Sequence, residues 1–251
     1  MSIARHAGNS CKPRIVSPET MYDAICEYGI IPFFENPVRG YSVEELTPPQ
    51  FWFDGDEGAS LGPWDWKIYC VQRGDIAYGK FLGGKAAFAT VPFYRQLMNW
   101  RRSLPRYAVA PGPQAEILEY VQRNGSAGIR DIRQLLGVKK NVADALVTKL
   151  QMATRLVTGD IVRVYRGADL HYSGWQTASF CTPDALFGLD GASNASSGPE
   201  QSLSRFPGFP FADEAAEELP SPEASRAWLL EQLRSRNPNT PENLIIKLLS
   251  G

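Results

Sequence analysis

The sequence predicts an α+β protein in which three short helices and a β-hairpin lie between an N-terminal helix/hairpin part and a C-terminal helical pair. Residues 111–183 contain three helical patterns followed by two β-prone runs. This order, over about 70 residues, is that of a winged helix-turn-helix domain. A Gly83-Gly84 pair predicts a separate β-hairpin upstream. Pro-led helix starts after Ser221 and Thr240 predict the two helices downstream.

Helix starts, glycines and changes of composition divide the chain into five parts. We expect a tail, a helix/β-hairpin domain, the winged helix-turn-helix domain, a linker rich in Gly, Ser, Pro and acidic residues, and C-terminal helices. The predicted bounds are 1–17, 18–108, 111–188, 189–220 and 221–251. An apolar stripe of Trp228, Leu229 and Leu233 predicts that the C-terminal helices pack on the body of the protein.

The N-terminal part has clear helix and turn signals. Ser17-Pro18-Glu19 predicts a helix start, and Gly29 predicts its end. Ser42 and Glu45 form a capping-box pattern for a short second helix. A further amphipathic helix is expected over 92–102.

The predicted hairpin has a register and two distinct faces. A two-residue turn at Gly83-Gly84 places Leu82 opposite Lys85 and Gly79 opposite Phe88. Alternation of side chains then gives a core face and a basic face. The core face is expected to carry Phe81, Ala86 and Phe88, and the basic face Tyr78, Lys80 and Lys85.

Residues 111–183 give the clearest periodicity. Helices are predicted from Pro113 to Gly125, from Ile129 to Gly137, and over 139–152. In the third helix, Val142, Leu146 and Leu150 are expected to point inward at i, i+4 and i+8. The outward arc then holds Lys140, Asn141, Asp144, Thr148 and Gln151, with Lys139 at the amino end.

Charge is distributed unevenly although the net charge is only −1. Residues 60–110 carry eight basic and two acidic side chains, and residues 111–183 carry nine and six. Both ends of the chain are acidic. A basic middle between acidic ends predicts an anionic partner for the middle.

Several classes of site are absent from the sequence. The four cysteines are far apart and form no CxxC pair, and there are only two histidines, so we expect no metal site. Neither a phosphate-binding glycine loop nor a GxSxG motif occurs, and we expect no cofactor. No secretory signal or membrane-spanning run is present, which predicts a cytoplasmic protein with no membrane association.

The stretch GPWDWKIYC, residues 62–70, places two tryptophans around an acid. We expect a strand over 64–72, with Trp64, Trp66, Ile68 and Cys70 on an apolar core face. The alternative is that the indoles form a stacking platform for a base. With the indoles in the core, Asp65 and Lys67 lie on the outer surface, where Asp65 is a weak candidate for a catalytic acid.

These patterns together predict binding of double-stranded DNA. The third helix is expected to enter a major groove, with the strands as a wing on the backbone. The predicted contacts are Lys67, Tyr78, Lys80, Lys85, Arg101, Arg102, Lys139, Lys140, Asn141, Thr148, Gln151, Arg163 and Arg166. Two alternatives stay open: a transcriptional regulator without enzymatic activity, and a protein-interaction module, since winged helices serve both roles.

Four stretches together resemble the AlkZ-related proteins, a branch near the AlkZ/YcaQ-type winged-helix DNA glycosylases. They are WDWK (64–67), AYGKFLGGKAAF (77–88), KLQMATRLVTGD (149–160) and GWQTASFCTPD (174–184). The resemblance implies winged-helix architecture and base excision of alkylated or cross-linked bases. Those glycosylases use a Gln-x-Gln motif, and none occurs in this chain. No catalytic residue can therefore be transferred, and the resemblance leaves enzymatic activity open.

Overall fold

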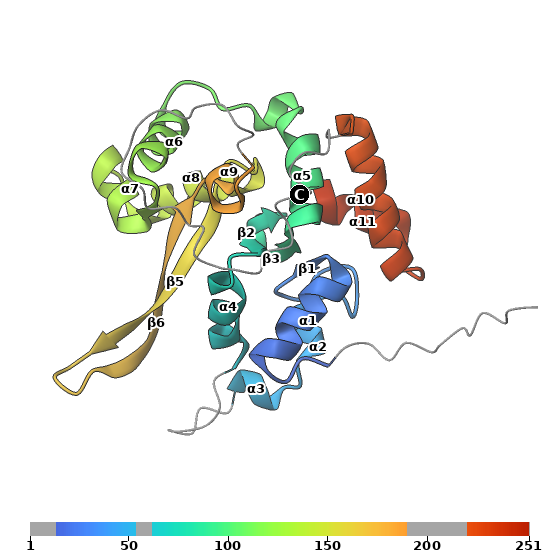
Figure 1. Ribbon diagram of the computed structural model, residues 1–251, viewed down its shortest axis with the longest axis horizontal. Helices are drawn as coiled ribbons and strands as arrows, with labels where there is room; N and C mark the ends of the chain where they lie inside the picture. The colour runs from blue at the N-terminus through green and yellow to red at the C-terminus, as the bar shows by residue number, and fades with distance from the viewer. Residues whose placement is uncertain (1–13, 54–61, 190–219, 251) are drawn as a thin grey trace, which may run out of the picture.

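The computed structural model describes residues 14–53, 62–189 and 220–250 (Figure 1). The described chain is α+β, with helices and two small antiparallel sheets. Most of the predicted linker 189–220 and most of the predicted tail lie outside the described residues. None of the described helices is long and apolar enough to cross a membrane.

The N-terminal part begins with α1 (Pro18–Tyr28), as predicted. The Ser17 hydroxyl accepts a hydrogen bond from the backbone N–H of Thr20 at 3.2 Å, and Gly29 ends the helix with a φ of 72°. Ile15 is fully buried and donates its N–H to the carbonyl of Leu46 at 3.0 Å. The expectation of a free tail over 1–17 is therefore wrong at its last residues, because Ile15 belongs to the core.

The first sheet has the order β1-β3-β2, from β1 (Ile30–Pro32), β2 (Ile76–Leu82) and β3 (Lys85–Thr90). Short helices α2 (Val43–Leu46) and α3 (Gln50–Phe53) follow β1. At α2 the Ser42 hydroxyl accepts from the N–H of Glu45 at 3.1 Å, which confirms the predicted cap.

The β2–β3 hairpin is confirmed, but its register differs by one residue. Leu82 pairs with Lys85 as predicted, whereas Phe88 pairs with Tyr78 and not with Gly79. The shift occurs between Gly79 and Leu82, where β2 has one residue more than β3. Such a bulge cannot be inferred from the alternation of side chains. Phe81 and Phe88 are fully buried, as expected for the core face.

Residues 63–72 form helix α4 (Pro63–Gln72), so the expectation of a strand is wrong. Gly62 and Pro63 provide a helix start, with proline in the first turn. Trp66 and Cys70 are buried at helical spacing i, i+4, which mimics the alternation of a strand over this short stretch. Trp64 is 46% exposed and lies outside the core face.

The central part has the three predicted helices and then the predicted pair of strands, with one further short strand between the first two helices. The helices are α6 (Pro113–Asn124), α7 (Ile129–Leu136) and α8 (Lys140–Met152). Strands β4 (Ala127–Gly128), β5 (Val157–Arg166) and β6 (His171–Cys181) form the second sheet in the order β4-β6-β5. The outer half of the β5–β6 hairpin projects from the body as an arm (Figure 1).

The buried face of α8 is one residue further round than predicted. Ala143, Val147 and Leu150 are buried, whereas Val142 is 42% exposed. A small alanine faces the crowded centre of the three-helix cluster, and the larger valine faces solvent. Hydrophobicity alone favours valine for the inner position, which explains the error.

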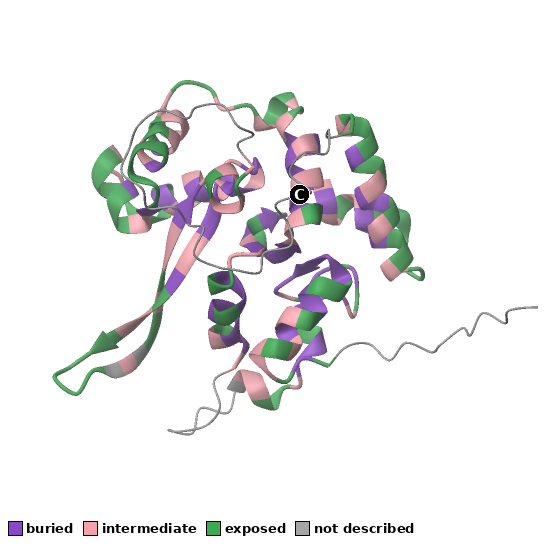
Figure 2. Ribbon diagram, viewed as in Figure 1, coloured by how far each residue is buried: buried purple, intermediate pink, exposed green. Residues whose placement is uncertain are grey.

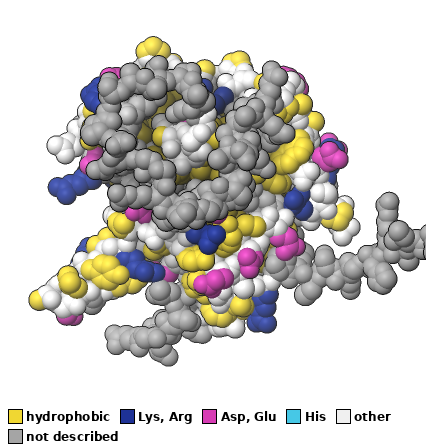
Figure 3. Space-filling view, viewed as in Figure 1, with side chains coloured by type: hydrophobic (Ala, Val, Ile, Leu, Met, Phe, Trp, Pro, Cys, Tyr) yellow, Lys and Arg dark blue, Asp and Glu magenta, His cyan; other side chains and the backbone are white. Residues whose placement is uncertain are grey.

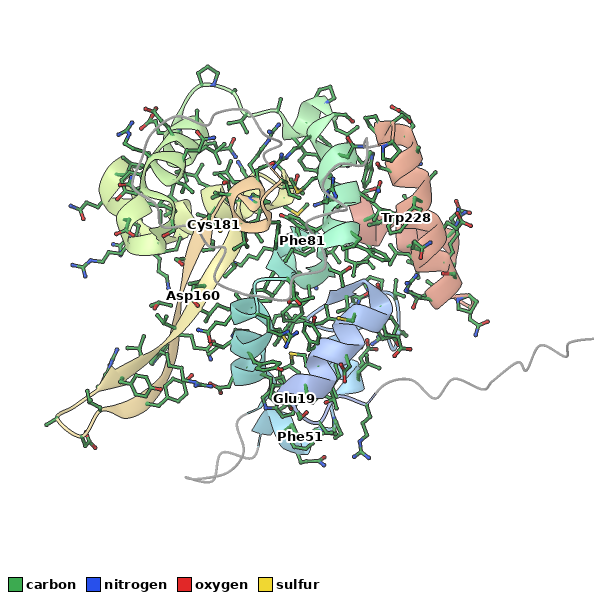
Figure 4. The ribbon with its side chains drawn as sticks, viewed as in Figure 1. Glu19, Phe51, Phe81, Asp160, Cys181 and Trp228 are labelled. Carbon is green, nitrogen blue, oxygen red and sulfur yellow. The ribbon has the colours of Figure 1, made fainter. Side chains whose placement is uncertain are left out.

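Helix α5 (Val91–Arg102) connects the first sheet to a 3₁₀ turn, Pro105–Tyr107, and α9 (Pro183–Phe187) follows β6. The C-terminal helices pack on the body of the protein, as predicted: α10 (Pro222–Arg236) packs on α5, and α11 (Glu242–Ser250) packs on α10 and β2. Leu229 and Leu233 are buried, and Figure 2 shows buried residues on α10. Trp228 lies on α10 (Figure 4), and its ring is edge-on to that of Phe93 with centroids 4.7 Å apart.

Candidate nucleic-acid interface and adjoining pocket

The outer face of α8 is exposed to solvent. Asn141, Val142, Ala145 and Lys149 are exposed at helical spacing, and Lys139 and Lys140 are exposed at the amino end. Of the predicted outward arc, Lys139, Lys140 and Asn141 therefore lie on the accessible face. An asparagine and a lysine on an exposed helix have the chemistry for adenine and for phosphate.

Three further exposed basic residues of α7 and α8 were not predicted as DNA contacts from the sequence. Lys149 lies two turns along α8 from Asn141, and Arg130 and Arg133 are exposed on α7. Lys149 is at position i+8 from Asn141. A helical wheel with its outward arc shifted by one residue from the predicted arc would therefore have placed Lys149 on the exposed face of α8. We call Arg130, Arg133, Lys139, Lys140, Asn141 and Lys149 the α7–α8 face.

Thr148 and Gln151, both predicted to contact DNA, turn toward the β2–β3 hairpin. Gln151 is buried, and its Oε1 accepts a hydrogen bond from the backbone N–H of Lys80 at 3.0 Å. The N–H of Gly84 donates to the Met152 sulfur at 3.1 Å, so the hairpin turn rests on the end of α8. The hairpin therefore brings the exposed side chains of Lys80 and Lys85 beside α8.

Arg101 and Arg102, also predicted as DNA contacts, join elements inside the molecule. Arg101 is fully buried and donates to the carbonyls of Phe81 at 2.6 Å, Met152 at 3.0 Å and Leu249 at 2.6 Å. Burial lowers the pKa of Arg101 to about 10. Arg102 forms an ion pair with Asp184 at 2.7 Å. Both guanidinium groups are thus engaged within the protein, and the basic end of α5 has a structural role.

Asp65 fixes the arm to α4. Its Oδ1 accepts a hydrogen bond from Nε of Arg163 on β5 at 2.9 Å. Gln176 on β6 donates to the carbonyl of Trp64 at 2.9 Å and to the hydroxyl of Tyr172 at 3.1 Å. These contacts give Asp65 a structural role at the junction of α4 with the arm. Arg163 serves this junction, whereas Arg166 further along the arm is exposed.

Lys67 is buried, contrary to the expectation that it lies on the outer surface. Its ammonium group lies 4.5 Å from the centre of the Trp64 ring. Burial lowers the pKa of Lys67 to about 8, and the charge of Asp65 acts in the opposite direction. Trp64 also packs against Phe33 and Phe34, with ring centres 5.3 and 5.6 Å away. Trp64 therefore caps an aromatic cluster and shields Lys67.

The arm carries exposed hydrophobic residues beside basic ones. Trp175 is 68% exposed and Leu170 is 69% exposed. Val162 and Tyr165 on β5 are also exposed. Figure 3 shows hydrophobic side chains along the arm next to Lys and Arg.

A pocket of about 140 Å³ lies between the β2–β3 hairpin, α8 and the inner part of the second sheet. Tyr78, predicted as a DNA contact, lines it together with Lys80, Asp144, Gln151 and Thr158. Gln151 spans the pocket, because its Nε2 donates to the Thr158 hydroxyl at 3.4 Å. No cluster of metal-ligating side chains occurs within the described ranges.

The fold and these surfaces define an α+β protein whose central three-helix unit presents an exposed helix with basic side chains beside a small pocket. A protein-family model described as AlkZ related matches residues 15–207, well over half of the chain. The chain belongs to the AlkZ-related family, in agreement with the resemblance of its motifs. No curated protein and no solved structure matches the chain significantly.

Proposed function

We propose that this protein binds duplex DNA in a repair-related role, using α6–α8 and β5–β6 as a winged helix-turn-helix domain. The α7–α8 face carries the proposal, because its five basic side chains and Asn141 are all exposed on two consecutive helices or at their ends. Lys80 and Lys85 extend this surface on one side. Such a surface suits the phosphate backbone, and the exposed α8 suits a major groove.

Membership of the AlkZ-related family supports a connection to DNA glycosylases. Catalysis of base excision is a separate question, since the chain has no Gln-x-Gln and Asp65 is paired with Arg163. Purified protein is incubated with DNA that carries alkylated bases or interstrand cross-links, and abasic sites are then measured. Formation of abasic sites would assign glycosylase activity to the protein. DNA that is fully bound but contains no abasic sites would assign a non-catalytic role.

DNA binding is tested by fluorescence anisotropy of a labelled duplex across a salt series. We expect affinity to fall steeply with salt, and the slope of log K against log salt to decrease by about one for each phosphate contact removed. Lys140→Ala with Lys149→Ala should therefore weaken binding and lower the slope by about two. Lys247→Ala is the matched control, because Lys247 is exposed on α11, on the opposite side of the molecule from α7 (Figure 1).

A role in protein–protein interaction is the second candidate. The exposed Val162, Leu170 and Trp175 of the arm favour it, since large apolar side chains at a surface are typical of interaction sites. Absence of any duplex binding at low salt would support this candidate over the first. A strong preference for one duplex sequence would instead indicate a transcriptional regulator.

A further inference from the structure

The pocket beside α8 opens next to the proposed DNA surface. Asp144 and Thr148 line the pocket, and their neighbours Ala145 and Lys149 lie on the exposed side of the same helix. Lys80 lines it from the hairpin side and is exposed. A group leaving a duplex bound to α8 therefore has a short path into this pocket, past a lysine that suits its phosphate.

The wall of the pocket is held in a fixed arrangement. The carboxamide of Gln151 is oriented by the N–H of Lys80 at 3.0 Å and by the Thr158 hydroxyl at 3.4 Å. Gly79 permits this approach, because a Cβ at that position would lie 2.9 Å from Nε2 of Gln151. Gly79 and the two hydrogen bonds fix the direction of Nε2 of Gln151. One of the two hydrogens on this Nε2 is left for another acceptor.

Two polar groups in the pocket have no hydrogen-bond partner among the residues that the structure describes. They are the Tyr78 hydroxyl and the Asp144 carboxylate. Burial raises the pKa of the Tyr78 phenol, so its proton is retained as a hydrogen-bond donor. Both residues are half-buried, so a ligand that enters the pocket can bond to these two groups in place of water.

The size and chemistry of the pocket restrict that ligand. A cavity of about 150 Å³ accepts one benzene ring, so about 140 Å³ suits a single six-membered ring. Val147 and Phe180 provide apolar contact. The Asp144 carboxylate accepts from an amino group, and Tyr78 and Gln151 donate to carbonyl or ring-nitrogen acceptors. Cytosine offers this combination, uracil lacks the amino group, and purines add a second ring.

We propose that this pocket binds the cytosine base of a nucleotide turned out of a duplex, with Asp144 accepting from its exocyclic amino group. The inference rests on the proposed DNA binding for the delivery of the base. The fit of the pocket to cytosine is independent of that step, so the two can be tested apart.

The first experiment tests the pocket without DNA, by saturation-transfer NMR with deoxycytidine and deoxyuridine. We expect deoxycytidine to bind with a dissociation constant on the order of 1 mM and deoxyuridine to bind about tenfold more weakly. Asp144→Asn should remove this discrimination, because a charge-assisted hydrogen bond becomes a neutral one. Glu116→Gln, the same chemical change at an exposed site on α6, should leave it intact. Equal binding of the two nucleosides, no binding at 10-fold higher concentration (about 10 mM), or discrimination retained in Asp144→Asn would overturn the assignment.

The second experiment compares duplexes that are fully paired or carry one unpaired cytosine or one unpaired thymine. The wild type should prefer the unpaired cytosine about tenfold, and Asp144→Asn should bind all three duplexes alike. Deoxycytidine binding without duplex binding would support the pocket and contradict the proposed function. Duplex binding with no preference for unpaired cytosine would support the function and contradict the delivery of this base to the pocket.

Discussion

Individual residues of this protein often have roles that their types do not suggest. Arg101, a charged residue at a helix end, is the largest fully buried side chain and bonds to three carbonyls. Lys67 is buried against Trp64, and Gln151 is buried between α8 and β2, where it accepts a hydrogen bond from the N–H of Lys80. The sequence shows charge and periodicity, but the acceptors of Arg101 come from residues 20 to 148 positions away. Partners so distant in the chain cannot be predicted from local patterns.

Lys67 provides a test at this scale through pH. Its pKa is lowered to about 8 in the folded state, so between about pH 8 and 10.5 the unfolded chain binds more protons than the folded protein. Its contribution to the free energy of unfolding is therefore least favourable below pH 8 and improves as pH rises through this window. Lys67→Met removes the buried charge, and we expect it to stabilise the protein by about 1–3 kcal/mol at pH 7 after the lost contact with Trp64 is subtracted.

The measurement is urea unfolding of both proteins at pH 7, 8, 9 and 10. The difference between variant and wild type cancels the buried tyrosines and cysteines, which titrate in both. That difference should shrink as pH increases. A variant that is less stable than the wild type by the same amount at every pH would contradict the burial of a charged Lys67.

Most elements whose ends are marked by glycine or proline are predictable here, and α4, which begins at Pro63, is an exception. Pro113, Gly125 and Gly137 fix α6 and α7 to the residue, and the same signals locate β2 and β3. Their faces are less predictable, because a bulge near Gly79 and a one-residue rotation of α8 depend on neighbouring elements. Helix α4 was missed for a related reason, since ten residues fit a buried helix and a strand equally well.

The attachment of the arm to α4 gives a prediction at the scale of elements. Asp65→Asn removes the ionic part of the contact with Arg163. The Asp65 side chain is 12% exposed and the Arg163 side chain is 29% exposed. We expect a loss of stability of about 1 kcal/mol or less, and faster hydrogen exchange of backbone amides in the outer half of the β5–β6 hairpin. The inner half, around Val157 and Cys181, should be protected as in the wild type because it lies in the core.

Two variants make this test specific to the junction. Arg163→Lys keeps the charge but loses the planar fork, so we expect exchange rates between those of the wild type and Asp65→Asn. Glu119→Gln disrupts the exposed ion pair with Arg123 on α6 and should change neither stability nor exchange in the arm. Unchanged exchange in Asp65→Asn would show that packing alone holds the arm.

At the scale of the whole molecule, a few side chains join parts that are distant in the sequence. The largest core includes residues of the first sheet, of β5 and β6, and of both C-terminal helices. Arg101 connects β2, α8 and α11, and Arg102 connects α5 to α9 through Asp184. The sequence predicts each part, and the packing of the C-terminal pair follows from its apolar stripe. The pocket beside α8 could not be predicted, because it exists only where the hairpin meets α8 and the second sheet.

The C-terminal helices test this view of the molecule. The family match ends at residue 207, before α10 begins, yet Leu229, Leu233, Ile245 and Leu249 are buried in the main core. A chain that ends at residue 207 exposes the face of α5 that α10 covers, and Arg101 loses the hydrogen bond to the Leu249 carbonyl. We therefore expect it to melt far below the full chain, because the loss exceeds the 2–5 kcal/mol of a single buried leucine truncation.

Leu229→Ala should destabilise within that range, and Glu231→Ala, exposed on the same helix, should not. Where the shortened chain is still folded, its DNA binding should have the same salt dependence, since α7 and the amino end of α8 lie away from α10 and α11 (Figure 1). Equal melting temperatures of the two chains would show that the body of the protein is stable without its C-terminal helices.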